Sequence, residues 1–447
     1  MKKLIAVILV LVMVLSLAAC AGTKDPVVDQ PQNNVPENNQ PEQNDPVEDE
    51  NKAMTYAEYM AAPLDSEVTV ECYVQGNQSW WDNKVTVYAA DADGAYFIYE
   101  LACSEEDAAK LLPGTKIRVT GYKGEWEGEV EIMEGTFEFV EGADTYIAEA
   151  KDLTDLLGTE ELINYQNQLA SFKGLTVESI TYKNEGGDDI WLTLSKDGQE
   201  YSFTVERYLT DPESVVYQTV GSLQVGAVVD VEGYLYWYQG SDVHVTAIAI
   251  SYADYVAAPL DSYVTVECYV QGNQSWWDNK VTVYAADEDG AYFIYELACS
   301  EEDAAKLLPG TKIRVSGYKG EWEGEVEIME GTFEFAGSDT YIAEAKDLTD
   351  LLGTEELINY QNQLASFKGL TVASITYKNE GGDDIWLTLS KDGKEYSFTV
   401  EVYLTGPDTD VYTTVGTLEV GDVVNAEGFL YWYQGSDVHV TSIELAA

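Results

Sequence analysis

Basic residues and histidine are scarce in this chain of 447 residues. Lysine and arginine together number 24 against 80 aspartates and glutamates, a formal net charge of −56, and only two residues are histidine. Proteins hold phosphate backbones through lysine and arginine, so this balance argues against nucleic acid as a main partner and predicts repulsion from anionic lipid surfaces. The shortage of histidine excludes most histidine-rich metal centres, and we expect no metal and no cofactor.

Residues that could form a recognisable catalytic site are equally scarce. The three arginines, Arg118, Arg207 and Arg314, are too few for the phosphate charge that a nuclease must hold. His244 and His439 take the same position in two related segments, so each segment has a single histidine and no Ser–His–Asp or Cys–His arrangement. Carboxylates are so abundant that any chosen pair is uninformative about glycoside hydrolysis. The sequence therefore predicts that the protein is not an enzyme.

Apolar material is ample, at 45% hydrophobic and 12% aromatic residues, which excludes global disorder. The length suits three or four domains. Residues 91–94, Asp-Ala-Asp-Gly, run straight into an apolar segment and so lack the later oxygen ligands of a calcium loop. We expect a hairpin turn there.

The first residues carry the pattern of a secretory signal. A basic start is followed by an apolar run over residues 4–15, too short to span a membrane, and then by Leu17-Ala-Ala-Cys20. This ending resembles the bacterial lipobox, which implies removal of residues 1–19 and a diacylglycerol thioether on Cys20. The alternative is plain secretion with an incidental cysteine. We expect lipidation, and hence a cell-membrane lipoprotein anchored in the lipid bilayer on its extracytoplasmic face.

After Cys20 the composition changes to proline, asparagine, glutamine, aspartate and glutamate, with no aromatic residue before about residue 53. Such a stretch cannot bury enough surface to offset its ordering entropy. We interpret residues 20–53 as the lipidated cysteine followed by an acidic, disordered tether.

The remainder is a tandem duplication. Residues 61–139 recur as 257–335, and residues 145–206 recur as 340–401. Each unit of about 196 residues is too long for one small barrel, so we divide it into two halves, A and B. The expected domains are A1 (54–144), B1 (145–250, with N-terminal helices), A2 (251–339) and B2 (340–447). The differences between the recurring segments are Glu67/Tyr263, Ala92/Glu288, Thr120/Ser316, Glu178/Ala373 and Gln199/Lys394.

Hydrophobic alternation and turn residues predict five strands in each half. In A1 the expected elements are a lead-in helix at 56–62, strands at 68–75, 84–90 and 95–102, a short helix at 104–112, and strands at 116–122 and 129–139. In B1 they are helices at 148–157 and 159–168, strands at 175–182, 190–195 and 200–209, a loop or short helix, and strands at 228–237 and 244–250.

Five strands with a connector between the third and fourth is the order of the OB-fold, a partly open Greek-key barrel. Residues 112–121 and 225–233 resemble the fourth-strand entry of OB-fold proteins. The A half also resembles OB-type repeats in surface lipoproteins of anaerobic Gram-positive bacteria, which implies a fold and a location but no activity. We predict a mainly β protein of tandem five-stranded OB-fold-like barrels, two per unit and four in total.

Tryptophans gather in the loops that bind ligands in OB-folds, between strands one and two and between strands four and five. In A1 these loops carry Trp80, Trp81 and Trp126, which we expect to converge on one rim. Apolar rings beside asparagine, glutamine and aspartate suit the faces and hydroxyls of sugars, whereas neighbouring glutamates oppose base stacking. The alternative that some of these rings cover a barrel end or the A–B junction stays open. The second copy supplies Trp276, Trp277 and Trp322.

In B, the candidate rim residues are Trp237 and Trp432, each in an aromatic hairpin (236–242 and 431–437). Ordinary strand pairing explains such a hairpin equally well. Cysteines leave a similar choice. Outside the cell their even number favours disulfides, while buried thiols acting as small apolar residues are the competing interpretation. The four are Cys72, Cys103, Cys268 and Cys299.

Taken together, the sequence predicts a membrane-anchored extracellular binding protein, with glycans or another cell-surface partner as the ligand and two sites that gain avidity by linkage. The alternative is a structural spacer or surface-assembly protein, which needs no ligand. Single-stranded nucleic acid binding follows from the fold alone and is opposed by the charge, so no nucleic acid partner is expected.

Overall fold

Domain A1 is a closed barrel whose strands follow the order β1-β2-β3-β5-β4. Only β3 and β5 pair in parallel. In β1, Val68, Val70, Cys72 and Val74 are buried at every second position, as a strand with one face on the core requires. The elements are α1 (Tyr56–Ala61), β1 (Glu67–Asn77), β2 (Lys84–Ala90), β3 (Ala95–Ala102), α2 (Glu105–Ala108), β4 (Lys116–Trp126) and β5 (Glu129–Phe139).

Domain B1 closes in the same way. Its sheet has the order β10-β11-β9-β8-β7-β6, and the additional pairing of β10 with β7 completes a ring of five strands with the short β6 beside it. The elements are β6 (Lys151–Asp152), η1 (Thr154–Leu156), η2 (Leu162–Tyr165), β7 (Leu169–Tyr182), β8 (Ile190–Lys196), β9 (Gln199–Val205), α3 (Val215–Ser222), β10 (Val228–Trp237) and β11 (Ser241–Ile250).

The second unit repeats this pattern with the same strand order. A2 contains α4 (Tyr252–Ala257), β12 (Tyr263–Asn273), β13 (Lys280–Ala286), β14 (Ala291–Ala298), α5 (Glu301–Ala304), β15 (Thr311–Trp322) and β16 (Glu325–Thr340). B2 contains β17 (Lys346–Asp347), η3 (Thr349–Leu351), η4 (Glu355–Tyr360), β18 (Leu364–Tyr377), β19 (Ile385–Lys391), β20 (Lys394–Val400), α6 (Val402–Thr405), α7 (Asp410–Val415), β21 (Val423–Trp432) and β22 (Ser436–Leu445).

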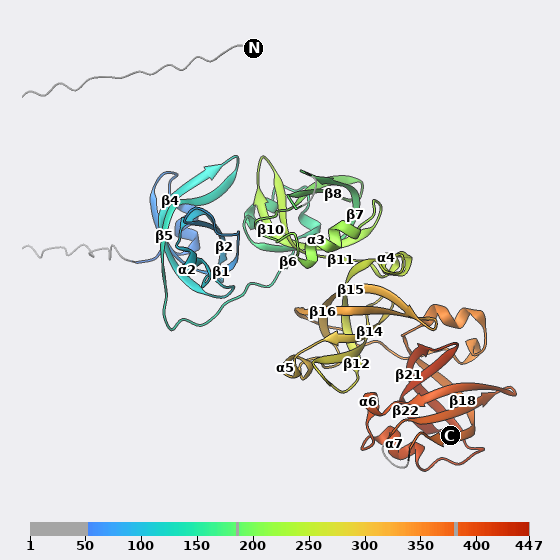
Figure 1. Cartoon of the computed structure of the whole chain (residues 1–447). Coiled ribbons are helices and arrows are strands. Elements are labelled where there is room, and N and C mark those ends of the chain that lie inside the picture. The colour runs from blue at the N-terminus through green and yellow to red at the C-terminus, as the bar shows by residue number, and fades with distance from the viewer. Residues whose placement is uncertain (1–51, 185–186, 380–382, 447) are drawn as a thin grey trace, which may run out of the picture. The chain divides into compact units, whose positions relative to one another are not determined.

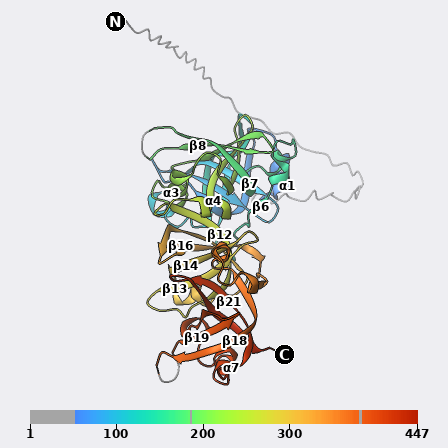
Figure 2. The ribbon, with the colours of Figure 1, turned by 90° about the vertical axis from the view of Figure 1, so that its right-hand side faces the viewer.

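This computed structural model describes residues 52–184, 187–379 and 383–446. Figure 1 shows A1 beside B1, and Figure 2, turned by 90°, shows A2 beside B2. The protein is mainly β, with four five-stranded OB-fold-like barrels, so the predicted fold is confirmed. The predicted signal, Cys20 and most of the tether lie outside the described residues.

The helices expected at 148–157 and 159–168 are not formed. Lys151 and Asp152 instead pair in parallel with β7, and the 3₁₀ turns η1 and η2 follow. Leu153, Leu157 and Leu162 still point into the B1 core, so the leucine spacing reports burial and not helix. Gly158 interrupts the segment with a φ of 74°, a left-handed conformation that ends regular helix.

Candidate ligand-binding surface

Trp80 and Trp81 are neighbours in the loop between β1 and β2, but their side chains have different surroundings. The indole Nε1 of Trp80 donates a hydrogen bond to the carbonyl oxygen of Cys103 at 2.9 Å, and the ring is half-buried. Trp81 is 53% exposed, and its backbone pairs with that of Lys84. The same difference separates the copies Trp276 and Trp277.

Around Trp81 lies a small exposed surface, which we call the β2–β3 patch and define as Trp81, Lys84, Tyr99 and Glu100. The Lys84 Nζ lies 5.8 Å from the Trp81 ring centroid and 2.5 Å from Glu100 Oε2. Tyr99 is 43% exposed. The patch therefore presents an indole face beside an ion pair that offers both donors and acceptors. The second copy has the same patch in Trp277, Lys280, Tyr295 and Glu296.

A bulge between β2 and β3 builds this patch. The register shifts between Val85 and Val87, so that two residues of β3 lie opposite Thr86. Glu100 takes a φ of 48°, and its backbone N–H donates to Thr86 Oγ1 at 3.2 Å. A bulge of this kind redirects a side chain at a sheet edge. Here it places the Glu100 carboxylate against Lys84, and the hydrogen bond raises the pKa of that lysine.

The face of A1 next to the patch is covered by B1. The Tyr88 ring of β2 stacks on the Tyr234 ring of β10, with 4.2 Å between the ring centroids. The rings of Phe97 in β3 and Tyr236 in β10 also contact each other, with 5.3 Å between their centroids. The Tyr88 hydroxyl lies 2.5 Å from Nδ1 of the buried His244. Strand β2 is therefore buried both on the side that faces the barrel core and on its outer side.

The β4–β5 hairpin of A1 also contacts B1. The backbone N–H of Gln239 donates to the Glu127 carbonyl at 2.9 Å, and that of Trp237 donates to Glu129 Oε2 at 2.8 Å. Trp237 also lies against Gly128, where an added Cβ would come within 2.8 Å of the indole. Together with the rings of β2 and β3, these contacts make what we call the A–B joint.

The predicted tryptophans are therefore distributed among four places. Trp80 is turned inward, Trp81 lies on the β2–β3 patch, and Trp126 is 58% exposed at the end of the β4–β5 hairpin. Trp237 is a residue of the A–B joint, the alternative that sequence left open. The second copy places Trp276, Trp277, Trp322 and Trp432 in the corresponding positions.

Sequence reasoning missed the ionisable groups of the joint. Burial raises the pKa of Glu129 to about 8, and burial also raises those of Glu131 and Glu206 to about 7. Glu206 accepts a hydrogen bond from Gln78 Nε2 at 2.8 Å across the joint. Burial lowers the pKa of His244 to about 4, so it is neutral at physiological pH. In β5 the glutamates alternate with Val130 and Ile132, a pattern that predicts exposure.

The four cysteines that the structure describes are free thiols: Cys72, Cys103, Cys268 and Cys299. All four are buried, and burial raises the pKa of Cys72 well above its usual range. Within residues 52–184, 187–379 and 383–446, no cluster of histidine, cysteine, aspartate or glutamate could hold a metal ion. In the same residues, no helix has the length and apolar character to cross a membrane.

Neither a protein-family model nor a curated protein matches this chain. Solved structures do. The p204 HINb domain is 9% identical over 36% of this chain and 95% of its own, with a TM-score of 0.18. A murine DNA-binding protein bound to double-stranded DNA is 11% identical over 41% and 94%, with a TM-score of 0.23. A replication protein A heterotrimer bound to single-stranded DNA is 9% identical over 86% and 95%, with a TM-score of 0.21.

These neighbours correct one expectation. Two of them are DNA complexes, and the prediction that nucleic acid is not a partner is wrong as a deduction from net charge. The deduction summed charge over the whole chain, whereas binding depends on the charge at one surface. Barrels of this fold bind both oligonucleotides and oligosaccharides. Nucleic acid therefore belongs among the ligands to be tested.

Proposed function

We propose that the chain is a non-enzymatic binding protein that holds extracellular glycans on the two β2–β3 patches. The exposed indole of Trp81, with the Lys84–Glu100 ion pair beside it, is the observation that carries this proposal. An indole face packs against the apolar face of a sugar ring, and it is large and rigid. The ion pair supplies a donor and an acceptor for the sugar hydroxyls beside that ring.

Duplication supports the same function. The patch of A2 repeats that of A1 residue for residue, with the lysine 5.8 Å from the indole centroid in both. Two weak sites in one chain bind a repeating polymer more tightly than either alone, because the second contact is intramolecular. A polysaccharide is a repeating ligand of this kind. We therefore propose that affinity rises with the length of the glycan.

The test is a titration of the full chain with soluble cell-wall, plant and host glycans, followed by tryptophan fluorescence. We expect a saturable shift that is lost in the Trp81→Ala/Trp277→Ala variant, because each patch loses its indole. The matched control is Trp126→Ala/Trp322→Ala, which removes equally exposed indoles from the β4–β5 hairpins and should bind normally. A shift retained in the Trp81→Ala/Trp277→Ala variant would refute the patch.

Single-stranded oligonucleotides belong in the same titration. A saturable shift with an oligonucleotide and none with any glycan would assign the protein to nucleic acid binding. A flat response to both would favour the spacer function, for which the interlocked A–B joints are the supporting observation.

We also propose that Cys20 is acylated and anchors the protein at the extracytoplasmic face of the cell membrane. The support is the Leu-Ala-Ala-Cys ending after a short apolar run. Two acyl chains hold a protein at a bilayer stably, where one chain does so only marginally. Anchored binding of this kind would retain glycans at the cell surface.

A further inference from the structure

B1 and A2 meet through a second set of contacts, which we call the B–A joint. Helix α3 and strand β11 of B1 pack against β12 of A2. The hydroxyls of Thr219 and Thr265 lie 2.6 Å apart, and both side chains are completely buried. Ser222 Oγ donates to the Tyr263 carbonyl oxygen at 2.7 Å. These contacts are direct hydrogen bonds between the two domains.

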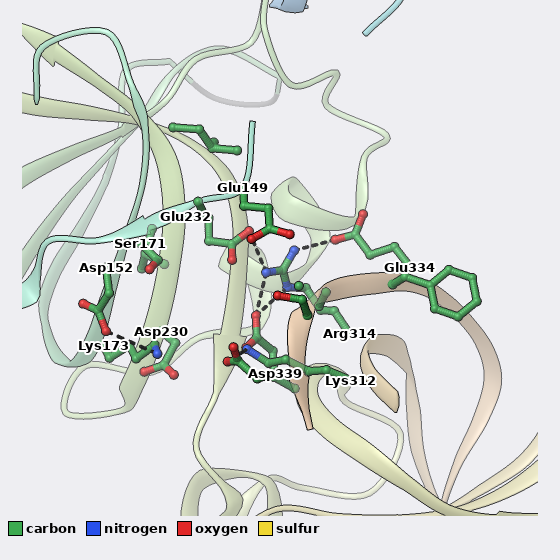
Figure 3. A pocket seen from close by; sticks show the side chains of 18 of the residues that line it. Glu149, Asp152, Ser171, Lys173, Asp230, Glu232, Lys312, Arg314, Glu334 and Asp339 are labelled. Carbon is green, nitrogen blue, oxygen red and sulfur yellow. Dashed lines mark hydrogen bonds and ion pairs between the residues drawn. The ribbon is translucent and has the colours of Figure 1, made fainter. Parts of the chain in front are cut away.

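Arg314 of A2 is the central ion of this joint. Figure 3 shows its guanidinium between carboxylates from both domains. The Arg314 Nη2 lies 2.8 Å from the Glu232 carboxylate of B1 and 2.6 Å from the Glu267 carboxylate of A2, and its Nη1 lies 2.5 Å from the Glu334 carboxylate. The side chain is only 7% exposed. A buried arginine costs free energy unless its donors are paired, so Glu232 stabilises the joined state.

B2 carries the corresponding face with a changed surface. In B1 this face includes Ala247 and Ala249, which are 6% and 3% exposed in the joint. Their counterparts in B2 are Ser442 and Glu444, both exposed. At the start of the adjoining helix, Val215 of B1 corresponds to the exposed Asp410 of B2. Polar and charged groups thus replace apolar ones on this face of B2.

These changes lie in the more divergent part of the two domains. Residues 145–206 and 340–401 differ at only two positions, whereas residues 207–250 and 402–445 differ at fifteen, among them Val215/Asp410, Ala247/Ser442 and Ala249/Glu444. A carboxylate placed where Ala249 is buried would lose hydration in a cavity that the carboxylates of Asp230 and Glu267 also line, and neither change is favourable. Repeat proteins need polar outer faces on their terminal repeats for the same reason.

A1 carries the other half of the joint. Its Arg118 corresponds to Arg314, with Nη1 3.7 Å from Glu71. The hydroxyls of Thr69 and Thr120 lie 2.9 Å apart, as those of Thr265 and Ser316 do at 2.8 Å in A2. Glu67, which stands where A2 has Tyr263, is one difference on this face. The docking face is therefore largely retained on A1.

We propose that the outer face of A1 keeps the surface that A2 presents to B1, and that Asp410, Ser442 and Glu444 on B2 prevent B2 of a second copy of this chain from docking there end to end. The B–A joint forms once, within the chain. On the matching face of B2, Asp410, Ser442 and Glu444 take the places of Val215, Ala247 and Ala249. A1 retains Thr69 and Arg118 at the positions where A2 uses Thr265 and Arg314 in the joint.

The test restores the B1 residues on B2 in the full chain, as Asp410→Val/Ser442→Ala/Glu444→Ala, together with Glu67→Tyr on A1. Sedimentation velocity over a range of protein concentrations measures association. We expect one monomeric species for the unaltered chain, and for the variant a weight-average mass that at least doubles as concentration rises. Adding Arg118→Ala to the variant should abolish this gain, because Arg118 would take the place of Arg314 across the new joint.

A variant that stays monomeric with an unchanged circular dichroism spectrum would overturn the proposal. So would association of the unaltered chain that Arg118→Ala removes. A second measurement covers a variant that fails to fold: Ala247→Ser/Ala249→Glu introduces the B2 residues into B1. We expect faster hydrogen exchange in α3 and unchanged exchange in α7, which has no partner domain in the described chain; equal exchange in α3 would refute the role of these residues.

Discussion

At the scale of single residues, Glu129 is a carboxyl group whose surroundings suit its protonated form. Its Oε1 and the Oδ1 of Asn167 are both buried, and within the described residues neither has a hydrogen-bond partner. The Asn167 Nδ2 donates to the Val130 carbonyl at 3.2 Å. Burial raises the pKa of Glu129 to about 8, so the carboxyl group is largely protonated at pH 7.

This group makes stability depend on pH. The folded-state pKa of Glu129 is about 8 against an ordinary 4.5, so above pH 4.5 the folded state binds more protons than the unfolded state and stability falls as pH rises to about 8. Between pH 7 and 8 His244 is largely neutral in both states and contributes little. We expect the melting temperature to fall over this interval, and less so in Glu129→Gln/Glu325→Gln. Differential scanning calorimetry measures the change.

The control for this experiment is Glu106→Gln/Glu302→Gln, which removes two carboxylates that are almost fully exposed. These variants should retain the pH dependence of the unaltered chain. An identical slope in the Glu129→Gln/Glu325→Gln variant would show that other groups cause the effect.

Gly128 tests the A–B joint through one contact. Its φ is +103°, and a Cβ would lie 2.8 Å from Trp237 Cδ1. Gly128→Ala/Gly324→Ala should therefore suffer left-handed strain of about 1–2 kcal/mol and overlap costing about 1–3 kcal/mol more per site. Gly142→Ala/Gly337→Ala isolates the strain, because both glycines have positive φ and open space around them. Urea unfolding should show the larger loss in free energy of unfolding for Gly128→Ala/Gly324→Ala. Equal losses in the two variants would show that the contact of Gly128 with Trp237 does not stabilise the joint.

At the scale of elements, the strands and the two short helices of A1 were predictable, whereas the helices expected at the start of B1 are not formed. The predicted strands 84–90, 95–102, 129–139 and 228–237 coincide with β2, β3, β5 and β10. These strands could be predicted because apolar residues recur at every second position where one face of a strand lies on a barrel core. The leucines at 153, 157 and 162 have a spacing close to that of a helix. The chain before them instead forms strand β6, which pairs with β7.

Helix α1 depends on one lysine from β4. Lys123 Nζ donates to the carbonyl oxygens of Tyr59, Met60 and Ala62 at 3.1, 2.7 and 2.9 Å, which satisfies the end of a helix that has only six residues. Lys319 does the same for α4. Replacement by methionine in both copies should cost about 2–3 kcal/mol per site, because these carbonyls lose a charged donor in a buried place.

Urea unfolding measures this loss too, and Lys110→Met/Lys306→Met is the matched control. Those lysines pair with glutamate and aspartate on an exposed surface, where ion pairs contribute about 0–1 kcal/mol. Similar losses in both pairs would show that α1 and α4 are held by other contacts.

At the scale of the whole molecule, the number and type of domains followed from repeats and strand order, but their packing did not. An alternating strand such as β2 reveals its core-facing side, whereas its outer Tyr88 is as compatible with solvent as with a joint. Trp81 and Trp126 are exposed and Trp80 is half-buried, so ligand binding by the three tryptophans stays a prediction. The net charge of the whole chain did not predict the binding partners, because it does not say where on the surface the charges lie.

Anchoring belongs to this scale as well. If Cys20 is acylated, the protein made in a bacterial host should partition into the detergent phase of a Triton X-114 extraction, and Cys20→Ala should move it to the aqueous phase. Cys103→Ala removes a described, buried thiol and should leave partitioning unchanged. Detergent partitioning by Cys20→Ala would exclude lipidation at this residue.

The free thiols in the A barrels have a consequence for how this protein is produced. Since no covalent bond between Cys72 and Cys103 is present in the structure, the native state is reached without electron acceptors, thiol oxidases or isomerases. We therefore expect A1 and A2 to fold equally well under reducing and under oxidising conditions. Alkylating reagents reach these sulfurs only when a barrel opens, so their rate of labelling reports how often each A barrel unfolds.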